Sequence, residues 1–290
     1  AGRNFANKLW NGARFVLNTI ESSQVQVTHV TQKPIQLEDK WIISRLEKVK
    51  QDVNKMLGDF QIGQAEQVLR DFLWDEFFDW YLEMAKIRIN KNDFTPVNIL
   101  AEVLEKSCLL LHPFMPFITE EIWQNLVSIS PNKSNDKESL MISTYPKSNN
   151  ALIDEKAEEE LKEISEVIRS IRNLRAELKI DPSINIETLL SSEKYIDVFE
   201  ENREIIEVLG KTTPLQITAD PKQGSSFLNT TSTVLDYSTI VVPLDDLIDT
   251  DEEKIRISEE IKTVELRIEQ LKKRLSDNNF ISKAPQEVIG

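Results

Sequence analysis

The first twenty residues carry side chains suited to contacts with nucleotides. One side of this segment on a helical wheel presents cationic, amide and aromatic groups: Arg3, Asn4, Asn7, Lys8, Asn11, Arg14, Phe15 and Asn18. No acidic residue precedes Glu21, although the chain is acid-rich. Amides hydrogen-bond base edges, cations meet phosphates and an aromatic ring offers a stacking platform, which together are what recognition of single-stranded RNA requires. The alternative is a solvated face whose Phe15 packs on a neighbouring helix.

Two further basic clusters are candidates for contacts with a nucleic-acid backbone. The first lies on one flank of a helix predicted for residues 152–179 and comprises Arg169, Arg172 and Arg175. These arginines could follow phosphates or pair with the acidic residues between 200 and 207. The second lies in the last turns of a helix predicted for residues 250–276 and comprises Lys272, Lys273 and Arg274. The helix dipole alone explains positive charge at that end, so a structural role is sufficient and RNA binding is an added possibility.

Residues with enzyme-like chemistry are few. His29 and His112 have no second ligand at metal spacing, so the sequence predicts no metal site. Cys108 and His112 lie in apolar stretches, and we expect both to be structural. Neither of the two glycine-rich patterns that bind the phosphate groups of nucleotides, the P-loop and the dinucleotide-binding loop, occurs in the sequence. We therefore expect no catalytic residue and no cofactor site within these 290 residues.

Composition excludes several classes of protein. The formal net charge is −14, with −2 in residues 1–150 and −12 in residues 151–290, which argues against binding DNA by bulk attraction. The apolar runs fall far short of the roughly 20 residues that span a bilayer, so we expect no membrane association. The start lacks the pattern of a secretory signal, and one cysteine forms no internal disulfide. A reducing cytoplasm fits best.

The hydrophobic pattern predicts a mainly helical fold in three parts. Residues 1–148 read as a bundle of four or five helices, followed by a polar region with one short extended run at 140–144. In the first helix the core-facing stripe is Gly2, Phe5, Ala6, Leu9, Ala13, Val16, Leu17 and Ile20. Residues 149–248 read as the long helix followed by a small α+β module. Its predicted order is a strand at 184–190, a helix at 193–209, a strand at 215–218 and a hairpin from 227–235 and 239–242.

Residues 249–290 read as a coiled-coil arm. A capping box begins at Thr250, and apolar residues alternate four and three apart from Ile257 to Leu275. Such a seam needs a partner, so the chain could self-associate through it. A return helix could begin near Pro285, but none could be completed before residue 290.

Six segments resemble the anticodon-binding region and arm of valyl-tRNA synthetases. They are residues 2–15, 39–46, 72–83, 111–123, 168–177 and 277–285. The segment from Leu111 to Phe117 also resembles the isoleucyl and leucyl enzymes, so the first helix and the arm are what favour valine. The resemblance covers nearly the whole chain. It implies that the bundle holds the tRNA anticodon and that the arm reaches the outer corner of the tRNA.

By this resemblance Lys8, Asn11, Arg14 and Phe15 match positions near anticodon nucleotides, with the Phe15 ring stacking on a base. The full family joins valine to tRNA(Val) with ATP and Mg2+, as a monomer. The His-x-Gly-His and Lys-Met-Ser-Lys-Ser signatures of its nucleotide-binding domain do not occur here. We therefore expect the chain to be a C-terminal piece of a longer ligase, without catalytic or editing sites of its own.

Three hypotheses follow. The first is a tRNA-recognition module of a valine–tRNA ligase, with the same region of an isoleucyl or leucyl enzyme as its close alternative. The second is a helical interaction protein that dimerises through the seam from Ile257 to Leu275 without binding RNA. The third, a free-standing enzyme, is disfavoured because no self-sufficient active site is present.

Overall fold

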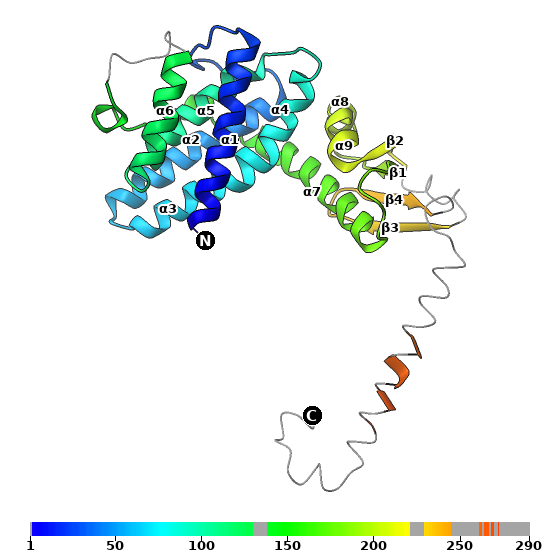
Figure 1. Ribbon diagram of the computed structural model, residues 1–290. Coiled ribbons are helices and arrows are strands. Elements are labelled where there is room, and N and C mark those ends of the chain that lie inside the picture. The colour runs from blue at the N-terminus through cyan, green and yellow to red at the C-terminus, as the bar shows by residue number, and fades with distance from the viewer. Residues whose placement is uncertain are drawn as a thin grey trace, which may run out of the picture.

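In a computed structural model of the chain, residues 2–129, 138–220 and 229–244 are described, together with 261–262, 264–266, 268–269 and 272. Residues 2–129 form the predicted bundle, in which the elements are α1 (Gly2–Ser23), α2 (Leu37–Gly58), α3 (Ile62–Asp71), η1 (Phe72–Tyr81), α4 (Leu82–Ile89), α5 (Pro96–Leu111) and α6 (Pro116–Ile129). Because α3, η1 and α4 follow one another without a break, the bundle has five helical rods (Figure 1). The prediction of four or five helices is confirmed.

Helix α5 is the centre of the bundle. It contacts α1, α2, α3, α4 and α6, and nearly all of its residues are buried. Most of its residues are apolar, and even Glu102 and Glu105 are buried, which is the pattern of a helix enclosed by others. Pro96 begins it, where the missing backbone N–H costs nothing. The surrounding helices therefore bury one stripe each and leave their other faces for function.

The middle of the long rod is wound more widely than an α-helix. Element η1 is a ten-residue π-helix, a form that occurs mostly as short insertions near functional sites. Its apolar side chains are buried, among them Phe77, Phe78 and Tyr81. Tyr81 donates a hydrogen bond of 2.7 Å to Asp39 of α2, and Arg88 of α4 binds the same carboxylate at 2.8 Å. These bonds hold the rod against α2 and fix the side of η1 that faces α1.

Helix α7 (Glu155–Glu177) joins the bundle to the α+β module, and it contacts α2 on one side and α9 on the other. Asp154 caps its first turn by accepting a hydrogen bond from Ala157 N. The module adds β1 (Ile186–Ser191), α8 (Ile196–Glu201), α9 (Arg203–Gly210), β2 (Thr212–Thr218), β3 (Thr230–Val234) and β4 (Thr239–Pro243). Figure 1 shows α7 running from the bundle to this module.

The described strands form one mixed sheet in the order β2-β1-β4-β3. Strands β1 and β2 are parallel and are joined through α8 and α9, whereas β4 pairs antiparallel with both β1 and β3. The register pairs Leu190 with Ile217 on one side and with Ile240 on the other. The predicted hairpin is therefore confirmed, and the fold is mainly α with a small α+β module, as expected.

Three sequence predictions of local structure were wrong in detail. The run at 140–144 does not form a strand, because Leu140–Ile142 is a 3-10 turn in which Ser139 accepts a hydrogen bond from Met141 N. The helix expected for 193–209 breaks at Asn202, whose side chain bonds to the carbonyl of Val198. Gly2 of the expected core stripe is exposed, whereas Phe5, Leu9, Ala13, Val16 and Ile20 are buried.

Most of the predicted arm lies outside the described residues, including Ile257, Leu271 and Leu275 of the seam. The described positions between 261 and 272 are helical, and Ile261, Val264 and Ile268 are exposed there. In the part of the chain that the structure describes, no helix has the length and apolar character needed to cross a bilayer.

Candidate nucleic-acid interface

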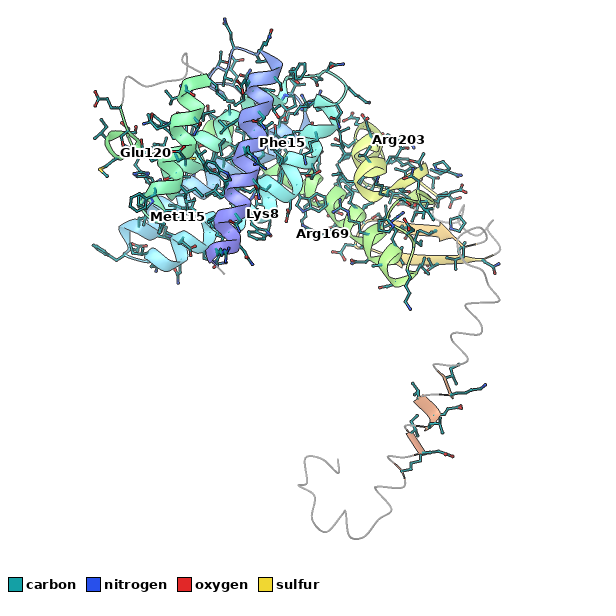
Figure 2. The ribbon with its side chains drawn as sticks, in the orientation of Figure 1. Lys8, Phe15, Met115, Glu120, Arg169 and Arg203 are labelled. Carbon is teal, nitrogen blue, oxygen red and sulfur yellow. The ribbon has the colours of Figure 1, made fainter. Side chains whose placement is uncertain are left out.

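The outer face of α1 presents its polar side chains to solvent. Phe5, Leu9 and Val16 point into the core, which turns the opposite side of the helix outward. All the asparagines and arginines predicted on that side are exposed, and Lys8 and Phe15 are half-buried: Arg3, Asn4, Asn7, Lys8, Asn11, Arg14, Phe15 and Asn18. Figure 2 shows Lys8 and Phe15 along α1, with Arg169 on α7 beyond them.

Lys8, Asn11 and Phe15 line an open cleft of about 480 Å³ between α1 and the η1–α4 rod. The Nζ atom of Lys86 lies 4.9 Å from the centre of the Phe15 ring. Trp74 of η1 lies beside Lys8, with its ring centre 4.2 Å from the Lys8 Nζ atom. Phe15 is half-buried, so it is neither enclosed by protein nor fully exposed, and it lines the open cleft. We call this space the Phe15 cleft.

Two carboxylates enter the Phe15 cleft from the opposing rod. Asp79 Oδ1 accepts a hydrogen bond of 2.5 Å from Lys8, and Glu83 Oε1 accepts one of 2.6 Å from Lys86. The outer face of α1 carries no acidic residue of its own before Glu21. Carboxylates of the η1–α4 rod, about 70 residues later in the sequence, therefore face it. Each lysine is already paired with a carboxylate, and a phosphate must compete with that carboxylate for the ammonium group. The pairing therefore lowers the net attraction of the cleft for an anion.

Gly12 allows the close approach that shapes this cleft. A Cβ atom added at Gly12 would lie 2.2 Å from Cε1 of Phe78, well inside a normal contact. The missing side chain lets the Phe78 ring of η1 pack directly on the α1 backbone. Asn11, Gly12 and Phe15 all line the cleft.

Arg14 does not join the other three predicted residues. It lines a separate groove of about 310 Å³ on the other flank of α1, together with Trp10, Leu17 and Asn18, and with residues of α6. The polar face of α1 is therefore a ridge with a hollow on each side. A helical wheel gave the face correctly but could not show that it is divided.

The basic flank of α7 is largely occupied by contacts within the protein. The guanidinium groups of Arg169 and Arg172 lie 5.0 and 5.5 Å from the centre of the Trp80 ring. Arg172 also donates a hydrogen bond of 2.8 Å to the carbonyl of Leu209. Burial lowers the pKa of Arg172, Glu83 opposes this change and Arg169 adds to it.

Arg175 is buried and holds the chain together. It donates hydrogen bonds of 3.0 and 2.9 Å to the carbonyls of Lys211 and Asp181. Burial lowers its pKa, and the Asp181 carboxylate opposes that change. Neither it nor Arg172 forms the predicted alternative pairs with the acidic residues of 200–207; both bind main-chain oxygens instead. We therefore leave Arg175 out of the proposed RNA surface and keep Arg169, which is exposed.

The remaining predicted contacts lie at the two ends of the chain. Arg3 is exposed on the first turn of α1, and Lys272 is exposed on the described part of the arm. Lys273 and Arg274 lie outside the described residues.

Two residues singled out for their chemistry have structural surroundings. Cys108 is buried, and burial raises the pKa of its thiol. His112 Nδ1 lies 2.8 Å from the hydroxyl of Thr119. The expectation that both residues are structural stays a prediction.

The fold also brings together three residues that sequence spacing did not connect. His29, Glu102 and Glu105 offer ligand atoms within 4.8 Å of one another. The ammonium of Lys106, however, lies 3.6 and 3.5 Å from oxygens of the two glutamates, so it already supplies the positive charge that a cation would bring. We interpret the group as an ion-pair cluster.

The sequence predictions missed what the η1–α4 rod contributes to the Phe15 cleft. Phe78, Asp79 and Lys86 lie on the side of the rod that faces α1. Their spacing places them within about 100° of one another on a wheel with 3.6 residues per turn, but a wheel drawn for one helix does not show that this side faces α1. The one available signal was the concentration of aromatic residues between 72 and 81.

Comparison with known families accounts for this arrangement. Residues 39–190, more than half of the chain, match the family described as the anticodon-binding domain of tRNA ligases. The chain belongs to that family. The match begins at α2, so α1 and its outer face lie before it. Residues 249–290 match the family described as the valyl-tRNA synthetase tRNA-binding arm.

Individual relatives agree with both matches. The valine–tRNA ligase of Dehalococcoides mccartyi is 38% identical over 290 residues, which cover 100% of this chain and 32% of the relative. The valine–tRNA ligase of Carboxydothermus hydrogenoformans is 37% identical over 99% of this chain and 32% of its own length. That of Listeria innocua is 35% identical with the same coverage. The resemblance to valyl-tRNA synthetases is confirmed, and the chain spans about a third of the length of these relatives.

Proposed function

We propose that the chain recognises the anticodon loop of tRNA(Val) as part of a valine–tRNA ligase. The half-buried Phe15 ring, which lines an open cleft, is the observation that carries the proposal. An unpaired base can stack on that ring, Asn11 beside it can bond a base edge, and Lys8 and Lys86 can meet the adjacent phosphates. The exposed Arg169 and Arg3 extend the positive surface toward the stem, and Lys272 does so on the arm.

The rest of the ligase reaction belongs to other parts of such an enzyme. Joining valine to tRNA would use ATP and Mg2+, and the 290 residues hold neither nucleotide-binding signature, so we assign no ATP or Mg2+ site to them. We propose a cytoplasmic, monomeric parent enzyme that binds tRNA and not DNA. The domain boundaries remain as proposed, with the bundle in 1–148, the long helix and α+β module in 149–248 and the arm in 249–290.

Titration with an RNA hairpin tests this function. The probe is a fluorescein-labelled anticodon stem-loop of tRNA(Val), followed by anisotropy at low salt because the association is electrostatic. Phe15→Ala should weaken binding by roughly 1–3 kcal/mol, the contribution of one base stacked on an aromatic ring. Phe15→Leu keeps the apolar volume but loses the flat π-face, so it should lose most of the same affinity.

The matched control is Phe60→Ala, because Phe60 is 87% exposed at the turn between α2 and α3. It should bind the hairpin as the unchanged chain does. Equal affinities for Phe15→Ala and the unchanged chain would reject the site. A hairpin with the anticodon of tRNA(Ile) tests the close alternative, since binding it as tightly as the valine hairpin would reject the valine assignment.

A second role is favoured by the described part of the arm. Ile261, Val264 and Ile268 are 52%, 56% and 45% exposed, and they occupy one seam of the predicted coiled coil. We propose that the isolated chain self-associates through this seam. Sedimentation of the unchanged chain and of a variant with Ile261→Glu and Val264→Glu tests this; a monomer at micromolar concentration in both cases would reject it.

A further inference from the structure

The groove on the α6 side of α1 has the make-up of a second base-binding site. The indole of Trp10 forms part of its wall and is 39% exposed, which is high for so large an apolar side chain. Leu17 and Ile129 add apolar surface, and the hollow of about 310 Å³ lies within the range of roughly 300–1,000 Å³ that holds small ligands. A flat apolar wall with one open face is suited to stacking.

The polar ridge of α1 lies between this groove and the Phe15 cleft. Trp10 and Phe15 are five residues apart, which corresponds to roughly 7.5 Å along the helix axis and about 140° around it. Asn11 and Asn18 lie on the outer face between these two flanks, and both are exposed. A strand that places one base against Phe15 must cross this ridge to continue, and crossing it leads directly to Trp10.

The charges of the groove favour a base rather than a phosphate. Arg14 supplies one guanidinium, but Glu21 and Glu121 stand at the rim, and both are exposed. Two carboxylates repel a phosphate, whereas they accept hydrogen bonds from the exocyclic amino group of a base such as cytosine. Arg14 can stack on the outer face of a base or meet the phosphate that follows it. Asn125 of α6 donates to Glu121 and holds that carboxylate at the rim.

We propose that this groove, formed by Trp10, Arg14, Asn18, Glu21 and Glu121, binds a second unpaired base of the same RNA strand, and that this base carries an exocyclic amino group. The inference rests on the proposed function, because the occupant is the strand that also uses the Phe15 cleft. The two bases would straddle α1, one on each side of the ridge. Recognition then depends on two separate aromatic platforms rather than one.

The test separates the two sites by pairing protein variants with altered RNA. The anticodon stem-loop is prepared with an abasic residue at each loop position in turn, and its affinity is measured for the unchanged chain, Trp10→Ala and Phe15→Ala. Trp10→Ala should weaken binding of the intact hairpin roughly 5- to 150-fold, the loss expected for one stacked base. That loss should vanish at one abasic position, and the loss from Phe15→Ala should vanish at a different one. Trp10→Phe, which keeps a ring, should retain most of the affinity.

A second experiment tests whether the two carboxylates recognise the base. It uses the loop position at which the abasic residue abolishes the effect of Trp10→Ala. Replacing the nucleotide at that position by uridine, which has no exocyclic amino group, should weaken binding several-fold. In the double variant Glu21→Gln and Glu121→Gln this preference should fall, whereas Asp52→Asn, an exposed acid on α2, should leave it unchanged.

The outcomes distinguish the two proposals. If Phe15→Ala weakens binding and Trp10→Ala changes it by less than twofold, the second site is wrong and the proposed function stands. If neither variant weakens binding, both are wrong. If both losses vanish at the same abasic position, the strand does not straddle α1 and the second site is again wrong. Thermal unfolding of each variant shows whether a loss reflects the site or the fold.

Discussion

The outer face of α1 and the basic flank of α7 carry similar cationic side chains, but their neighbours differ. Along α1, Asn11 and Arg14 project into solvent beside open hollows. Along α7, Arg172 and Arg175 donate to main-chain carbonyls of the α+β module. The first set is free to bind a ligand, whereas the second set holds two parts of the protein together. A row of cations indicates a binding surface only where the protein has not already used its hydrogen-bonding groups.

Arg175 provides the largest expected effect. Arg175→Met removes two hydrogen bonds from a buried charged donor, which should lower the free energy of unfolding by about 2–3 kcal/mol. Chemical denaturation measures this loss. Arg3→Met, at an exposed position, should change stability by less than about 0.5 kcal/mol. If Arg175→Met left stability intact but weakened RNA binding, the contrast between the two regions would be reversed.

Gly12 tests how tightly α1 and η1 must pack to form the Phe15 cleft. Gly12→Ala places a methyl group on the Phe78 ring, and overpacking of this kind costs roughly 1–3 kcal/mol of stability. Displacement of Phe78 should also narrow the cleft and weaken RNA binding. Gly63→Ala is the control, since a Cβ there meets no atom within 4 Å. A Gly12→Ala protein as stable as the Gly63→Ala protein would show that the close contact is not needed.

The variant Asp79→Asn tests whether the ion pair with Asp79 limits the binding of a phosphate by Lys8. Asp79→Asn should release the Lys8 ammonium for a phosphate, increase RNA affinity a few-fold and steepen the salt dependence by roughly 0.7, the value for one further single-strand phosphate. Asp52→Asn removes the same formal charge on α2 and should have little effect. Equal changes in both variants would mean that only net charge matters.

Arg169 has the smallest expected effect. Its guanidinium stacks on Trp80 and is exposed, so Arg169→Gln should weaken RNA binding only about twofold, uniformly for all loop sequences. Comparison of matched and altered loop sequences by anisotropy measures this. A sequence-dependent loss would mean that Arg169 contacts a base and that α7 belongs to the recognition surface.

The α1 face could be predicted from sequence because a single helix determines it. The spacing of Phe5, Leu9 and Val16 fixes which side is buried, and the polar side follows from it. Asp79 could not be predicted as the partner of Lys8, because the two residues are 71 positions apart and meet only through packing around α5. The carbonyl partners of Arg175 could not be predicted either, because every residue has a main-chain carbonyl and the side-chain pattern does not indicate which one is bound.

Local irregularities explain the remaining differences. The π-helical winding of η1 is one of them, and propensities for a regular helix do not indicate it. The break at Asn202 depends on a side chain that competes with the backbone for a hydrogen bond. The helical rods and the succession of strands along the chain, in contrast, follow from periodicity and could be predicted.

Stacking of an anticodon base on Phe15 is the central claim, and a fluorescent base reports on it most directly. The anticodon stem-loop is prepared with 2-aminopurine at one loop position at a time, and emission is measured on saturation with the unchanged chain and with Phe15→Leu. Emission at one position should be quenched by the unchanged chain and restored in Phe15→Leu. If no loop position differs between the two proteins, no base stacks on Phe15 and the account of the site is wrong.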